Sequence, residues 1–179
     1  MQLADFSQNY FELFGLNPVF DLDLSLLHSQ HQRLQASYHP DRHVNSGERE
    51  KRLSVQMASR INQAYETLRD PVKRSRYLLE IRGARMPDDS ETTSDSEFLM
   101  EQIELREALE ACRGSDDALG CCSRIEAGLI ERAGQLAAEF VECFEAGNLD
   151  AAGHSSRKMQ FIQRIQQQLS DLQFELEEA

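Results

Sequence analysis

Apolar residues along the chain recur three and four positions apart, the spacing of one face of an α-helix. No segment shows a convincing alternation of period two, which would predict a β-strand. The clearest stripe lies within residues 48–69. It consists of Leu53, Met57, Ile61, Tyr65 and Leu68. The pattern therefore predicts an all-α protein.

Four helices are expected in the first half of the chain, at about residues 9–14, 23–39, 48–69 and 71–82. Gly15 ends the first helix, and Asp23 is a good N-cap for the second. Pro40 stops the second helix, because the residue before a proline is pushed out of the helical conformation. Pro71 ends the third helix and can begin the fourth.

A polar stretch rich in helix breakers, residues 83–94, marks a linker between two domains. Ser94 and Glu97 have the spacing of a capping box at the start of the next helix. Three further helices are expected, at about residues 95–112, 116–146 and 149–178. Since short loops between long helices favour antiparallel neighbours, residues 95–179 are predicted to form a three-helix bundle.

The 179 residues carry a formal net charge of −12, which is unevenly distributed. Residues 1–82 have 11 Lys and Arg against 10 Asp and Glu, whereas residues 83–179 have 8 against 21. So acidic a chain is a poor candidate for binding nucleic acid or an anionic membrane surface. No apolar run approaches the ~20 residues of a membrane span, and no signal peptide is visible, so a cytoplasmic location is expected.

The chain contains four cysteines: Cys112, Cys121, Cys122 and Cys143. None forms a C-x-x-C pair, and no histidine lies beside them at zinc-ligand spacing. In a cytoplasmic protein the expectation is free thiols on helices. The adjacent pair Cys121-Cys122 could be redox-active, but neighbouring side chains on a helix point about 100° apart.

The tripeptide His39-Pro40-Asp41 lies on the loop between two amphipathic helices. A rigid proline between a ring donor and a carboxylate offers fixed polar groups to a partner. The alternative is that Asp41 caps the next turn and His39 is a solvated loop residue. The tripeptide alone is a weak signal, so the flanking segments decide between the two.

Those segments are similar to the J-domain, the module that stimulates ATP hydrolysis by Hsp70-type chaperones. Upstream is an aromatic helix ending in glycine, residues 10–16, and downstream are residues 61–71 followed by Arg74, Tyr77 and Leu78. The resemblance covers residues 9 to about 82. It implies an Hsp70-binding set of His39, Pro40, Asp41, Arg33 and Arg42. The second helix is less basic than is typical, because His28 and His31 lie beside Arg33 and histidines are mostly neutral near pH 7.

The second half resembles the HscB family, the J-type co-chaperones of bacterial iron–sulfur cluster assembly. Residues 98–109, FLMEQIELREAL, look like the signature of that family, and residues 157–162, RKMQFI, resemble its later helix. In that family the C-terminal bundle holds the scaffold protein IscU and presents it to the specialised Hsp70, HscA. The resemblance implies an L-shaped, two-domain, all-α protein with a J-domain helical hairpin. Some eukaryotic relatives add a pair of C-x-x-C motifs for zinc, which are missing here, so no metal and no cofactor are expected.

Periodicity gives an independent argument for a binding face on the helix of residues 95–112. At 100° per residue, Phe98, Leu105, Leu109 and Cys112 form a core stripe. Leu99, Met100 and Ile103 lie on the other side among carboxylates, which suits an interface. The residues that the resemblance assigns to scaffold binding are Leu99, Met100, Ile103, Glu104, Arg106, Glu107 and Phe161. On periodicity alone, Leu99, Ile103 and Phe161 could equally widen the core.

Together these observations predict a non-catalytic adaptor, with a J-domain over residues 1–82 and a scaffold-binding domain over residues 95–179. The main alternative is a J-protein that serves a different client. A helical interaction protein with a degenerate J-domain is a third possibility. An enzyme using His39 and Asp41 is disfavoured, because no phosphate-binding loop, activated nucleophile or metal-ligand set accompanies them.

Overall fold

The structure, a computed structural model, describes residues 7–38, 47–84 and 95–178, and in these ranges it is helical with no strand. The chain divides into two compact units, Met1–Gly83 and Ala84–Ala179. The predicted all-α class is confirmed. Within the described ranges no helix combines the length and the apolar character that crossing a membrane requires.

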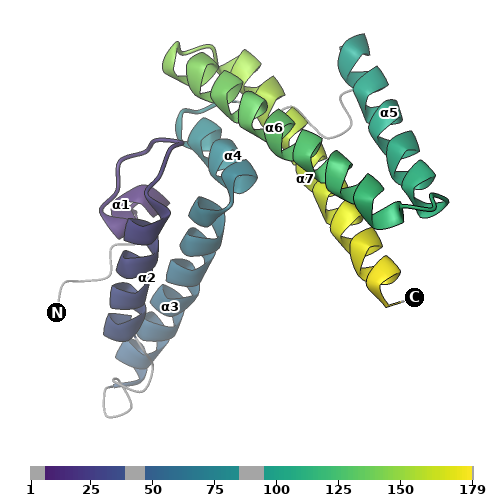
Figure 1. The fold of residues 1–179 in the computed structure, drawn as a ribbon. Helices are drawn as coiled ribbons and strands as arrows, with labels where there is room; N and C mark the ends of the chain where they lie inside the picture. The colour runs from purple at the N-terminus through teal and green to yellow at the C-terminus, as the bar shows by residue number, and fades with distance from the viewer. Residues whose placement is uncertain (1–6, 39–46, 85–94, 179) are drawn as a thin grey trace. The chain divides into compact units, whose positions relative to one another are not determined.

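The described part of the first unit contains four helices close to the predicted bounds (Figure 1). They are α1 (Tyr10–Phe14), α2 (Leu24–Tyr38), α3 (Glu48–Arg69) and α4 (Pro71–Ile81). Asn9 caps α1, with its side chain accepting from the backbone N–H of Glu12. Gly15 then ends α1 in the left-handed conformation, with φ of 65°, which costs a residue without a Cβ little.

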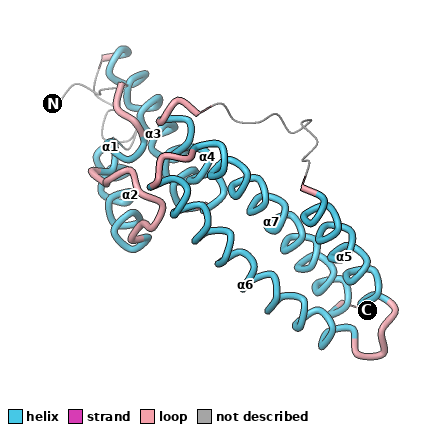
Figure 2. Tube along the Cα trace, turned by 90° about the horizontal axis from the view of Figure 1, so that it is seen from above, coloured by secondary structure: helices cyan, strands magenta, loops and turns pink. Residues whose placement is uncertain are grey.

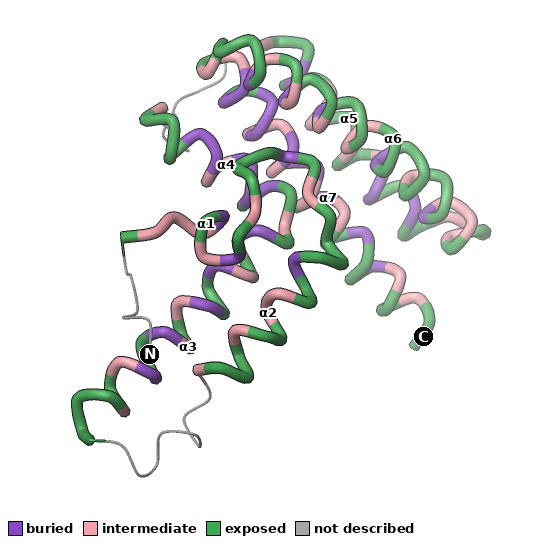
Figure 3. Tube along the Cα trace, turned by 90° about the vertical axis from the view of Figure 1, so that its left-hand side faces the viewer, coloured by how far each residue is buried: buried purple, intermediate pink, exposed green. Residues whose placement is uncertain are grey.

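The core of the first unit lies where α1, α2 and α4 pack on α3 (Figure 3). Its fully buried side chains include Phe11, Phe14, Leu27, Met57, Ile61, Leu68, Leu78 and Leu79. Leu27 of α2 is buried, whereas Leu34 and Tyr38, seven and eleven positions further along the same face, are only half-buried. Helix α2 therefore covers the core with one end and leaves most of its surface exposed.

The segment between α1 and α2 is fixed by Arg74 of α4, which is 7% exposed. Its guanidinium donates to the carbonyl oxygen of Leu68 and lies 4.9 Å from the centre of the Phe20 ring. Burial lowers the pKa of Arg74, while the nearby carboxylates of Asp21 and Asp70 act in the opposite direction. The side chain thus joins the end of α3 to the segment that leads into α2.

The second unit is a bundle of α5 (Ser96–Arg113), α6 (Ala118–Glu145) and α7 (Leu149–Glu177), as Figure 2 shows in a view of helices and connections. Helices α6 and α7 form a long antiparallel hairpin, on which α5 packs. Buried side chains of α6 include Leu129, Leu136 and Phe140, and those of α7 include Ile162 and Ile165.

Two expectations for this unit need correction. The N-cap of α5 is Asp95, which accepts from the backbone N–H of Phe98 at 3.0 Å, rather than the Ser94 of the expected capping box. Ser94 itself lies outside the described residues. The start of α5 therefore lies one residue later than expected. Asp95 can cap the helix in place of Ser94, because aspartate and serine are about equally good N-caps.

The second correction concerns the cysteines. Cys112 and Cys121 are joined by a disulfide, with their Cα atoms 5.5 Å apart, whereas Cys122 and Cys143 are free. The expectation of four free thiols is therefore wrong for two of them. The short connection between α5 and α6 brings the end of one helix against the start of the next, at a separation that suits a disulfide.

We predict that Arg74→Ala destabilises the protein by about 2–3 kcal/mol, because it removes a charged hydrogen bond and a cation–π contact from a buried site. Chemical denaturation followed by circular dichroism measures the change. Lys73→Ala is the matched control, because the neighbouring Lys73 is exposed, and it should stay within about 0.5 kcal/mol of the parent. Equal stabilities of the two variants would contradict this role for Arg74.

Candidate protein-interaction sites

The outward face of α5 carries three large apolar side chains that nothing in the described second unit covers. Leu99 is 40% exposed, Met100 57% and Ile103 48%. They lie within five consecutive residues of one helix, while Phe98 and Leu109 of the same helix are buried against the hairpin. Of the two interpretations that periodicity left open, the structure excludes a widened core for Leu99 and Ile103.

Charged side chains border this apolar face on α5. Glu104, Arg106 and Glu107, which were expected at the site, are all exposed. An apolar centre with a charged edge is the usual composition of a protein–protein interface, in which the centre is desolvated and the edge stays wet. We call the set of Leu99, Met100, Ile103, Glu104, Arg106 and Glu107 the α5 face.

Phe161 differs from the other expected binding residues because it is only 9% exposed. Its ring packs edge-on against Phe98, with the ring centres 5.5 Å apart, and the guanidinium of Arg106 lies 5.7 Å from its centre. Of the two possibilities that periodicity left open for Phe161, its burial therefore favours a place in the core beneath the α5 face. Phe161 lies beside the core stripe of α7, on the side where α5 packs. The periodicity of α7 alone does not show that α5 covers this side.

Two ion pairs fix the orientation of α5 on the hairpin. Arg132 of α6 donates to both carboxylate oxygens of Glu101, at 2.7 and 3.1 Å, and this pairing raises the pKa of Arg132. Lys158 of α7 lies 2.6 Å from the Asp95 carboxylate. The hydrogen bond from Lys158 lowers the pKa of Asp95. Sequence analysis missed both pairs, because their members are far apart in the chain and carry no local signal.

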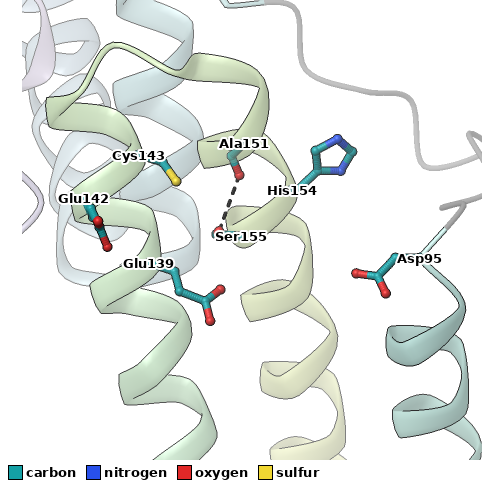
Figure 4. Close-up of a pocket in the computed structure, with 7 residues that line it drawn as sticks. All are labelled: Asp95, Glu139, Glu142, Cys143, Ala151, His154 and Ser155. Atoms are coloured by element: carbon teal, nitrogen blue, oxygen red, sulfur yellow. Dashed lines mark hydrogen bonds between the residues drawn. The ribbon is translucent and has the colours of Figure 1, made fainter.

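A separate hollow of about 410 Å³ lies between the facing ends of α6 and α7 and the start of α5 (Figure 4). Its lining includes Asp95, Glu139, Glu142, Cys143 and His154. Its acidic groups lie on one helix, α6, and at the N-cap of α5 (Figure 4). Across the residues that the structure describes, no group of three or more such side chains has a geometry that could hold a metal ion.

The second expected site lies only partly within the described residues. His39, Pro40, Asp41 and Arg42 fall outside them, between the end of α2 and the start of α3. Arg33 is described and exposed on α2, where it is the one lysine or arginine of that helix. The structure therefore places Arg33 on the helix that directly precedes the tripeptide in the sequence.

The two histidines of α2 turn toward α3. The His31 ring stacks on the Tyr65 ring with their centres 4.0 Å apart, and its Nε2 lies 3.1 Å from the Oδ1 of Asn62. The Nδ1 of His28 lies 3.1 Å from the hydroxyl of Tyr65. Both histidines therefore have partners within the helical pair, which sequence analysis did not foresee.

Each of the two units matches a known protein family. Residues 9–77 match the DnaJ domain family, and residues 94–170 match the family described as the HSCB C-terminal oligomerisation domain. The co-chaperone protein HscB homolog of Shewanella halifaxensis is 39% identical over 166 residues, which cover 90% of this chain and 95% of the relative. The chain belongs to the HscB co-chaperone family.

Solved structures of HscB proteins have the same fold. The chaperone HscB from Vibrio cholerae superposes with a TM-score of 0.86 at 36% identity, covering 94% of this chain and 99% of that one. The human co-chaperone protein HscB superposes with a TM-score of 0.86 at 27% identity, covering 95% and 84%. The chain is therefore a J-domain co-chaperone of the HscB type, and the resemblance found in the sequence is confirmed.

We predict that Phe161→Ala and Met100→Ala differ sharply in stability. Phe161 is buried between Phe98 and Arg106, so its truncation leaves a cavity and should cost about 3 kcal/mol or more. Met100 is mostly exposed, so its truncation should change the free energy of unfolding by less than about 0.5 kcal/mol. Thermal and denaturant unfolding measure both values. A stability loss for Met100→Ala as large as for Phe161→Ala would place Met100 in the core.

Proposed function

We propose that this HscB-family protein binds the iron–sulfur cluster scaffold IscU and delivers it to the specialised Hsp70 HscA, whose ATPase it stimulates. The observation that carries the proposal is the exposed apolar centre of the α5 face within a chain of this family. The protein acts as an adaptor for iron–sulfur cluster assembly in the cytoplasm and performs no catalysis itself.

Scaffold binding is assigned to residues 95–179, and within them to the α5 face with Phe161 beneath it. Exposed Leu99, Met100 and Ile103 gain free energy when a partner removes them from water. Met100 can adjust to the contour of the partner, because its side chain is unbranched and flexible. Phe161 contributes indirectly, since its ring holds the underside of the face and touches Arg106.

The charged edge of the α5 face adds selectivity. Glu104 and Glu107 are exposed on a half of the chain that carries 21 acidic against 8 basic residues. Such a surface attracts a basic partner surface and disfavours an acidic one. Arg106 is the one basic residue of the α5 face, and its guanidinium can form an ion pair with a carboxylate of the partner.

Hsp70 stimulation is assigned to residues 1–82, with residues 83–94 as the linker. The proposed contact set is His39, Pro40 and Asp41 with Arg33 and Arg42. Support comes from the match of residues 9–77 to the DnaJ domain family and from α2 and α3, which flank the tripeptide. That the protein serves a client other than IscU remains a second hypothesis. Direct titration with IscU distinguishes the two hypotheses.

We expect the double change Met100→Ala and Ile103→Ala to weaken IscU binding by 100-fold or more while the protein stays folded. Central apolar anchors typically cost ~2 kcal/mol each on truncation, although such values are not additive. Isothermal titration with purified IscU measures the affinity. Ile130→Ala is the control, because Ile130 is an equally apolar residue of α6 and is 61% exposed; it should bind like the parent. Unchanged binding by the double variant would remove the α5 face from the interface.

We expect His39→Gln to abolish stimulation of HscA ATPase with little change in melting temperature, because loop side chains contribute little to stability. Single-turnover ATP hydrolysis by HscA, with and without IscU, measures the effect. His154→Gln, at an exposed histidine of α7, is the matched control and should stimulate fully. Full stimulation by His39→Gln would show that His39 is not the triggering group.

A further inference from the structure

The disulfide of the second unit lies at the one turn that connects α5 to the hairpin. Cys112 is in the last turn of α5, and Cys121 is in the first turn of α6. Their Cα atoms are 5.5 Å apart, and nine positions separate them in sequence. Cys112 is fully buried and Cys121 is half-buried. The bond therefore closes a short loop at the C-terminal end of the helix that carries the α5 face.

Helix α5 has few other attachments to the hairpin. Its buried side chains are Phe98, Leu109 and Cys112, compared with ten buried residues on α7. Phe98 anchors the N-terminal end, where the Asp95–Lys158 and Glu101–Arg132 pairs also act. At the C-terminal end, the Arg113–Glu175 ion pair is about half exposed on both sides and contributes little. The C-terminal half of α5 is thus held mainly by Leu109 and by Cys112 with its bond.

We propose that Cys112 and Cys121 are a reversible thiol–disulfide pair that sets how firmly α5 is held on the hairpin, with a glutathione-type disulfide as the oxidant. In the oxidised protein the C-terminal end of α5 is tied to α6. In the reduced protein the same end opens more often. Arg106 and Glu107 lie within two turns of Cys112, so such openings reach the charged edge of the α5 face.

The exchange proceeds in two balanced steps. Cys121, the more exposed thiol, attacks one sulfur of oxidised glutathione as its thiolate; this forms a mixed disulfide and releases one glutathione thiolate. Cys112, as its thiolate, then attacks the Cys121 sulfur and releases the second glutathione thiolate. The two cysteine thiols are oxidised, one glutathione disulfide is reduced to two thiols, and the two cysteine protons end on the released glutathione.

The other two cysteines do not fit this role. Cys122 is fully buried and free, and Cys143 is free on the other end of α6. A bond between Cys121 and Cys122 is disfavoured, because adjacent side chains on a helix diverge by about 100°. Cys143 therefore supplies a matched control, as a thiol of the same helix that lies away from α5.

The test compares the full-length protein equilibrated in oxidised and in reduced glutathione. Alkylation followed by mass spectrometry counts free thiols, and hydrogen exchange reports the opening of residues 96–113. We expect two thiols in the oxidised sample and four in the reduced one. The C-terminal amides of α5 should exchange roughly 10- to 100-fold faster after reduction, as expected when a short closed loop is released. Cys121→Ser should exchange like the reduced parent in both buffers, and Cys143→Ser should still switch.

The consequence for binding rests on the proposed function, so it is measured separately by titrating IscU into both redox forms. A several-fold weaker affinity of the reduced form supports the proposal. Four free thiols in the oxidised sample, or exchange in α5 that does not depend on redox state, would overturn the proposal whatever IscU does. If the thiol count and the hydrogen exchange of α5 both change with redox state but the two forms bind IscU with equal affinity, the link to binding is overturned. Failure of both forms to bind IscU would instead refute the proposed function and leave the redox pair standing.

Discussion

The packing of Phe98 on Phe161 decides which side of α5 faces the solvent. With the two rings in edge-to-face contact, 5.5 Å between centres, α5 is rotated so that residues one and two positions beyond Phe98 point away from the hairpin. A helix places neighbouring side chains about 100° apart, and with Phe98 turned onto the hairpin Leu99 and Met100 lie on the outer side of α5, 40% and 57% exposed. The outward orientation of the α5 face therefore follows from the side on which Phe98 packs.

The ion pairs of α5 also fix how this helix is rotated about its own axis. Asp95 and Glu101 pair with Lys158 and Arg132 on the two helices of the hairpin. Because the partners come from different helices, rotation of α5 about its axis would break at least one pair. Ion pairs of this partly exposed kind add little to stability, so their main effect is on orientation. The α5 face thus depends on a small set of contacts, of which the Phe98–Phe161 packing is the most buried.

Local signals in the sequence were sufficient for the helices and most of their ends. Gly15, Asp23 and Pro71 act within one turn of the backbone, and the observed helices begin and end beside them. Periodicity also placed Met100 on the side of α5 opposite the core stripe, but it left Leu99 and Ile103 open between a binding face and a wider core. The burial of Phe161 and the pairing of Cys112 with Cys121 did not follow, since both depend on which side of the hairpin receives α5. Hydrophobic periodicity describes one helix at a time and contains no information on that choice.

Helix α2 carries little charge and is tied to α3 through its two histidines. His28 and His31 lie where a more basic helix would project cations, but both turn onto Tyr65 and Asn62 of α3. Arg33 is then the one fixed cation of α2. Long-range attraction to any acidic surface scales with the number of such charges and is screened by salt. A helix with one such charge offers little long-range attraction, so any contact made through α2 depends on short-range packing and hydrogen bonds, which discriminate between related partners better than net charge does.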